Sequence, residues 1–141
     1  MKCIAYTGGY KYQLKEPYCV KTDVKPALYI YTEYISLDTS GNIIISEGYA
    51  WDGPSGPTVD TLNFMRGSLV HDALYQLMRE RYLDHIYHRE ASDRTLQRLC
   101  LEDGMSSIRA WGVYHAVRLF ADPAASPSSI KPIIYAPDGC Q

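Results

Sequence analysis

The residues with the clearest chemical potential lie in one short segment, His71-Asp72-Ala73-Leu74-Tyr75. Residues four apart share a face of an α-helix, so His71 and Tyr75 would point the same way. Asp72, the next residue after His71, would point about 100° away from it. One helix can therefore present an imidazole and a phenol to one neighbour and a carboxylate to another.

A second carboxylate, Asp93, falls near the start of the next predicted helix. The connection between the helix that carries His71 and this next helix lets the two run antiparallel, which would bring Asp93 back to His71. A carboxylate there accepts the ring N–H of His71, fixes its tautomer and leaves the other nitrogen as a base near neutral pH. We therefore predict a hydrogen bond between the two. In the structural alternative, Asp93 favours the helix dipole or pairs with Arg89 at i,i+4.

The loop Trp51-Asp52-Gly53-Pro54-Ser55-Gly56-Pro57 precedes the histidine helix. Its glycines and prolines exclude regular structure and expose backbone carbonyls, which hard cations such as calcium use together with carboxylates. We expect a weak divalent-cation site, most simply Ca²⁺, in which Asp72 is joined by oxygens of this loop. The loop ligands would be Asp52, Gly53 and Ser55, although Asp52 is also a common turn former.

Several motifs occur in an order that resembles domain-of-unknown-function family 1353, which is found in phages, prophages and bacteria. They are Trp51-Asp52-Gly53-x-Ser55-x-Pro57, His71-Asp72-x-Leu74-Tyr75, Arg89-x-x-x-Asp93 and Ala116-Val117-Arg118-Leu119-Phe120. The resemblance covers roughly residues 43–120. It implies a phage or prophage origin and carries no activity with it.

The pattern His71-Asp72-x-x-Tyr75 followed by Asp93-Arg94 is also similar to the active-site helices of secreted and bacterial phospholipases A2. In those enzymes the histidine is the general base for water, and the adjacent aspartate binds calcium with carbonyls of a preceding glycine-rich loop. This resemblance implies that His71 is the base and Asp72 the calcium ligand. It also implies that Asp93 orients the histidine and that Tyr75 supports Asp93. The loop here differs, since it lacks the family's cysteines and contains prolines.

The elements that must position these residues form a strand-rich half followed by a helical half. We expect strands at 3–6, 10–14, 27–37 and 43–45, a turn at 8–9, an edge strand or loop at 18–24, and a hairpin turn at 38–42. We expect helices at 62–81, 89–101 and 106–120. Strands first and helices second predict an α+β fold. Residues 1–121 would form one domain, with a β-rich part at 1–50, the loop at 51–60 and a helical part at 61–121.

The last segment, residues 122–141, contains four prolines. Prolines deny a helix its hydrogen bonds, so we predict an extended arm with no helix. Its apolar side chains, Ile130, Ile133, Ile134 and Tyr135, need a surface to cover them, either on the same domain or on a neighbouring subunit.

Length and composition limit the function classes. The chain has 141 residues, 46% of them hydrophobic, which suits one globular domain. Its net charge is −2 and it has no run of Lys or Arg, so a nucleic-acid partner is not expected. No apolar run is long enough for a transmembrane helix, and Met1–Tyr6 lacks the apolar core of a signal peptide. Four scattered cysteines predict no structural zinc; they could form two disulfides in any of three pairings, but reduced thiols are favoured.

Two functional hypotheses follow. The first is a phage-encoded, metal-assisted hydrolase resembling phospholipase A2, which acts on an ester or amide at the host envelope and has lipid as a possible partner. The second is a non-enzymatic tail or connector protein that binds other phage structural proteins or itself. The 13 tyrosines against 2 phenylalanines fit such an interface, although they also fit ordinary strands. Both hypotheses place the protein in the virion or in the host cytoplasm during assembly.

Overall fold

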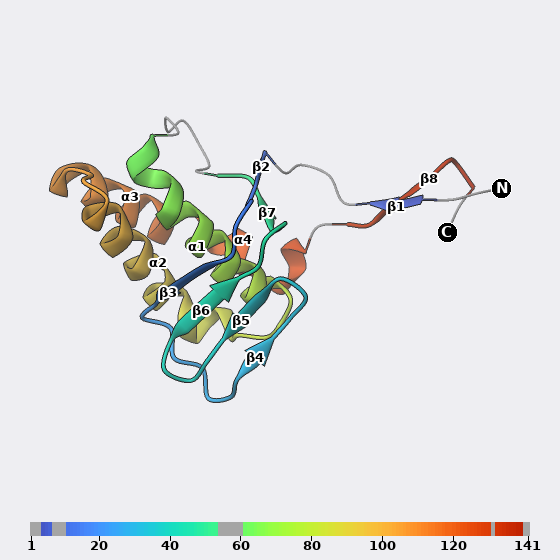
Figure 1. The fold of residues 1–141 in the computed structure, drawn as a ribbon, viewed down its shortest axis with the longest axis horizontal. Coiled ribbons are helices and arrows are strands. Elements are labelled where there is room, and N and C mark those ends of the chain that lie inside the picture. The colour runs from blue at the N-terminus through green and yellow to red at the C-terminus, as the bar shows by residue number, and fades with distance from the viewer. Residues whose placement is uncertain (1–3, 7–10, 54–60, 131, 140–141) are drawn as a thin grey trace.

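The computed structural model describes residues 4–6, 11–53, 61–130 and 132–139 of the chain. Antiparallel strands occupy the N-terminal half and helices most of the C-terminal half, which confirms the α+β prediction (Figure 1). The strands are β1 Ile4–Tyr6, β2 Tyr12–Gln13, β3 Tyr18–Lys21, β4 Ile30–Tyr31, β5 Ile35–Leu37, β6 Asn42–Ile45, β7 Ala50–Trp51 and β8 Ile134–Ala136. The helices are α1 Leu62–Arg79, α2 His85–Glu102, α3 Ser107–Phe120, the short α4 Asp122–Ala125 and the 3₁₀ turn η1 Pro127–Ser129.

The main sheet has the strand order β3-β6-β5-β4 and is antiparallel throughout. Its central hairpin turns where the sequence predicts, because the Asp38 carboxylate accepts the backbone N–H groups of Ser40 and Asn42. β3 is an edge strand, one of the two predicted alternatives for that stretch. The predicted long strand at 27–37 is wrong, since a turn divides it into β4 and β5. The Thr32 hydroxyl closes that turn by bonding the backbone N–H and C=O of Ile35.

Helices α1 and α2 form an antiparallel pair. Near the start of α1, Gly67 lies against Leu96 and Cys100 of α2, whereas Tyr75, two turns later, lies against Arg89. The absence of a side chain at Gly67 allows this close approach. α2 begins four residues before the predicted start, because the Asp84 carboxylate caps it by accepting the N–H groups of Ile86 and Tyr87.

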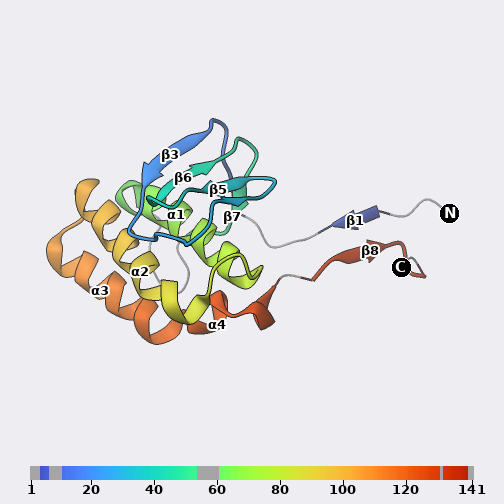
Figure 2. The same ribbon diagram turned by 90° about the horizontal axis from the view of Figure 1, so that it is seen from below.

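α1 is the central element of the core. One side of it packs on the inner face of the sheet, α2 packs on the other side, and α3 packs in turn on α2 (Figure 2). The sheet contributes Ile30, Ile35, Leu37, Ile43 and Ile45, and α1 contributes Val70, Leu74, Leu77 and Met78, all buried. A second apolar cluster joins Phe64 of α1 to α2 and α3. α1 is therefore buried along most of its length, and the neighbouring elements hold its side chains in a rigid scaffold.

The C-terminal segment differs from the prediction of an arm without a helix. That prediction is wrong for Asp122–Ala125, which form α4, because Pro123 occupies the first helical turn, where a missing N–H costs nothing. Ala125 is fully buried in the core, and Arg79 of α1 donates to the Ala124 carbonyl at 2.8 Å. α4 thus belongs to the domain.

Beyond η1 the chain leaves the body of the domain. β8 pairs antiparallel with β1, and the two form a ribbon that projects away from the helices and the main sheet (Figures 1 and 2). Ile133, Ile134 and Tyr135 are between 42% and 60% exposed on it. No helix in the described ranges has the length and apolar character to span a membrane.

Candidate functional site

The predicted hydrogen bond between His71 and Asp93 is present. The Nε2 atom of His71 in α1 lies 2.6 Å from Oδ1 of Asp93 in α2. Asp93 has no exposed surface and His71 is 7% exposed. The pairing follows from the antiparallel arrangement of the two helices, which places the third turn of α2 beside the third turn of α1.

The carboxylate of Asp93 has further donors. The hydroxyl of Tyr75 donates to Oδ1 at 2.6 Å, and Nη1 of Arg118 donates to Oδ2 at 3.0 Å. Burial alone would favour the protonated acid, but the hydrogen bonds from His71, Tyr75 and Arg118 hold the pKa of Asp93 below its ordinary value. Asp93 is therefore ionised at neutral pH, so Nε2 of His71 carries the proton and donates it to the carboxylate.

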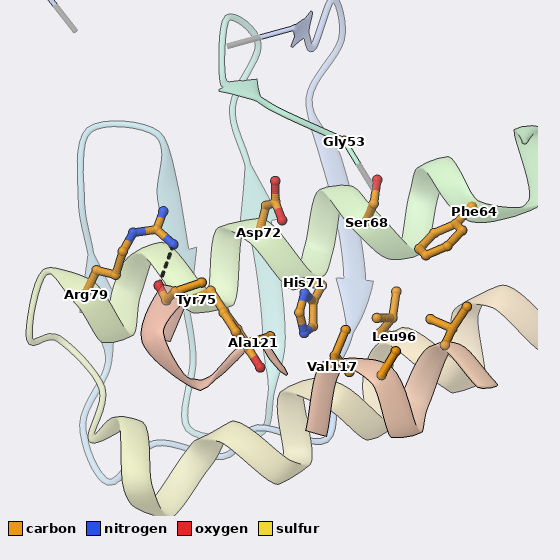
Figure 3. Close-up of a pocket in the computed structure, with 13 residues that line it drawn as sticks. Gly53, Phe64, Ser68, His71, Asp72, Tyr75, Arg79, Leu96, Val117 and Ala121 are labelled. Atoms are coloured by element: carbon orange, nitrogen blue, oxygen red, sulfur yellow. Dashed lines mark hydrogen bonds between the residues drawn. The ribbon is translucent and has the colours of Figure 1, made fainter. Parts of the chain in front are cut away.

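This tautomer leaves the other ring nitrogen of His71, Nδ1, as a hydrogen-bond acceptor. Within the described part of the chain, Nδ1 has no hydrogen-bond partner and is not among the fully buried polar atoms. The His71 side chain lines a cavity of about 110 Å³ between α1 and the α3–α4 region. Figure 3 shows the ring extending from α1 toward Val117. A water molecule or substrate in the cavity would therefore lie beside the ring that carries this nitrogen.

Two arginines complete the site, and sequence reasoning assigned neither of them. Arg118 comes from the last turn of α3, 25 residues after Asp93. Arg89 had been considered as an i,i+4 partner of Asp93. It donates instead to the Tyr75 hydroxyl at 3.3 Å and to the carbonyls of Val117 and Arg118 at 2.8 and 2.6 Å. Arg89 therefore connects the end of α3 to Tyr75, which itself bonds Asp93.

A signal for Arg118 was present in the sequence, within the Ala116-Val117-Arg118-Leu119-Phe120 motif. The sequence did not identify Asp93 as the partner of Arg118, because that contact depends on how α3 packs on α2.

The predicted cation ligands are only partly described. Asp72 and Gly53 line the same cavity as His71, and Figure 3 shows Asp72 on the side of α1 that faces Gly53. The backbone N–H of Asp52 donates to the Asp72 carboxylate. Burial, with a smaller contribution from the charge of Asp52, raises the pKa of Asp72 to about 6. Ser55 lies outside the described residues.

The donor set fits a hard cation in part. Two carboxylates lie close enough to repel each other, and the loop backbone begins beside them, so oxygen is the donor element that the site offers. Among the described residues, no cluster of three or more His, Cys, Asp or Glu side chains has the geometry of a metal site. Any cation here would rely on backbone oxygens and water for most of its ligands.

Comparisons of the chain with models of protein families, with curated proteins and with solved structures gave no match in any of the three.

Proposed function

We propose that the protein is a hydrolase in which His71 activates water for attack on an ester or amide. The observation that carries this proposal is the state of the His71 ring, which lines a cavity: Nε2 is held by the buried Asp93 carboxylate, and Nδ1 has no protein partner in the described chain. A histidine that only stabilises the fold would have both nitrogens satisfied. One oriented and one open nitrogen is the arrangement that general-base catalysis requires.

The chemistry assigned to these residues balances as follows. Nδ1 of His71 accepts a proton from water while the water oxygen bonds to the carbonyl carbon, and Asp93 stabilises the imidazolium that forms. The carbonyl π electrons move to oxygen. When the tetrahedral intermediate collapses, the bond to the leaving group breaks and Nδ1 returns the proton to that group. Tyr75 and Arg118 keep the Asp93 carboxylate in place throughout.

A divalent cation forms part of the proposal. Asp72, Asp52 and the backbone from Gly53 onward would hold it, and when bound it would polarise the substrate carbonyl. The repulsion between Asp52 and Asp72 supports this assignment, because a cation would relieve it. The resemblance to phospholipase A2 supports calcium, and the resemblance to family 1353 supports a phage or prophage origin.

The test is a hydrolysis screen with calcium and with EDTA, using short-chain 4-nitrophenyl esters, the corresponding anilides and phospholipid vesicles. His71→Gln should reduce the rate on any accepted substrate by roughly 10²-fold to 10⁴-fold. His115→Gln, a change at an exposed histidine of α3, should leave it unchanged. Circular dichroism would show that both variants fold. A His71→Gln protein that is folded and fully active would refute the proposal.

One observation favours a second candidate, a structural role in the virion. The β1–β8 ribbon projects from the domain and carries exposed Ile133, Ile134 and Tyr135, which suits insertion between neighbouring subunits. Quantitative mass spectrometry of purified phage particles tests this role. A fixed copy number per particle would support it, whereas absence from particles would refute it. The ribbon lies apart from His71, so the two functions are compatible.

A further inference from the structure

The cavity that borders His71 also contains a permanently charged side chain, Arg79. Arg79 ends α1, two turns after Asp72. Side chains on a helix lean toward its N-terminus, and in Figure 3 the Arg79 guanidinium leans back along α1 in this way. Its charge is thereby brought toward the part of the cavity that His71 borders.

The guanidinium is oriented but not neutralised. Nη1 donates to the Ala124 carbonyl of α4 at 2.8 Å, which anchors one end of the group. No carboxylate among the described residues lies within 4 Å of it, and no other hydrogen bond is made by its remaining nitrogens there. Among the described residues that line the cavity, Asp72 is the one acid, and it interacts with Arg79 only through space. The other N–H groups of Arg79 are therefore available to a ligand.

The lining of the cavity changes in character along α1. The end near the start of the helix is apolar, built by Phe64, Leu96 and Val113. His71 lies between that end and Arg79, and the wall opposite α1 consists of small residues of α3 and α4. A molecule that crosses the cavity would thus place an apolar group at one end and an anionic group at the other, with His71 between them.

The enclosed part of such a molecule is small. The cavity volume is about 110 Å³, less than the roughly 150 Å³ of an engineered cavity that holds benzene. On the same scale, a chain of about four carbons would fill this space. Longer substituents would have to extend through the opening to solvent.

We propose that Arg79 is an anion-binding subsite, which receives a carboxylate or phosphate group on a small, partly apolar substrate. A guanidinium with free N–H groups binds both anions through paired hydrogen bonds, which an ammonium cannot reproduce. The subsite rests on the proposed function only in that its ligand is taken to be the substrate of His71.

Binding is measured without turnover. ¹⁵N-labelled protein is titrated with butyrate and, separately, with 1-butanol, which has the same chain but no charge. Butyrate should shift the backbone signals around Arg79 and His71 and should bind more tightly than butanol. Arg79→Gln should weaken butyrate binding about tenfold, as expected for the loss of a charge-assisted hydrogen bond, and should leave butanol binding unchanged.

Arg81→Gln is the matched control, because Arg81 is an exposed arginine two residues further on. It should bind butyrate like the wild type. Arg79→Lys, which keeps the charge but not the planar fork, should lie between the wild type and Arg79→Gln and confirms that the domain tolerates substitution here. If inorganic phosphate displaces butyrate, the subsite accepts phosphoryl groups as well; if it does not, the subsite is specific for carboxylates.

The proposal is overturned if folded Arg79→Gln binds butyrate as tightly as the wild type, or if the wild type binds butanol at least as tightly as butyrate. These outcomes are separable from failure of the proposed function. A protein that hydrolyses nothing but binds butyrate through Arg79 would retain the subsite. An active hydrolase with no Arg79-dependent binding would lose the subsite and keep its activity.

Discussion

Asp72→Asn should stabilise the calcium-free protein at neutral pH, although the change removes a candidate ligand. Burial, then the charge of Asp52, raises the pKa of Asp72 from its ordinary value of 3.8 to about 6 in the folded protein. Between these two values the folded state binds more protons than the unfolded state, so stability falls as pH rises through this range. Above about pH 6 the folded protein carries the full cost of a partly buried carboxylate.

The free-energy cost of the ionised Asp72 carboxylate follows from the difference between its ordinary and its raised pKa. From 3.8 to about 6, at about 1.4 kcal/mol for each pH unit, the cost is about 3 kcal/mol. This is an upper limit, because Asp72 keeps some contact with solvent, which screens its charge. Asparagine retains an acceptor for the Asp52 N–H and has no charge, so it avoids the cost.

Urea denaturation of both proteins in EDTA, at several pH values from 4 to 8, checks this. The difference in unfolding free energy between Asp72→Asn and wild type should be near zero at pH 4 and should grow to at most about 3 kcal/mol in favour of the variant at pH 7.5. Other titrating groups are common to both proteins and cancel. A variant no more stable than wild type at pH 7.5 would refute the reasoning. Calcium should stabilise the wild type alone and so reduce the difference in unfolding free energy between the two proteins.

Three further predictions concern the scaffold. Tyr75→Phe removes a buried donor to Asp93 and should lower the unfolding free energy by about 1–3 kcal/mol in urea denaturation, so an unchanged midpoint would contradict the hydrogen bond. Gly67→Ala would place a Cβ 3.0 Å from Leu96 Cδ1 and should cost about 1–3 kcal/mol, measured the same way; a stabilised variant would show that α1 and α2 separate easily. Deletion of residues 132–141 should leave the melting temperature of the monomer unchanged, because β8 pairs with β1 outside the core; a clear drop would show that the ribbon packs on the domain.

The sequence by itself determined the parts of this protein that depend on local chemistry. Helical geometry placed His71 and Tyr75 on one face, and a short connection made the next helix antiparallel, so Asp93 had to return near them. The turn at Asp38 was likewise predictable from the sequence, because the Asp38 side chain bonds the backbone of its own turn. Each of these features is decided by residues within about 20 positions of one another.

The tertiary structure decided what depends on the docking of α3 and α4. Arg118 reaches Asp93 and Arg89 reaches the end of α3 only because α3 packs on α2, and Arg79 meets Ala124 only because α4 packs on α1. The same packing made α4 a helix where the prolines had suggested an extended arm, since burial of Ala125 favours a compact turn. Side chains that meet across separate helices are selected by how apolar faces fit together, and this fit depends on the whole core rather than on any one segment.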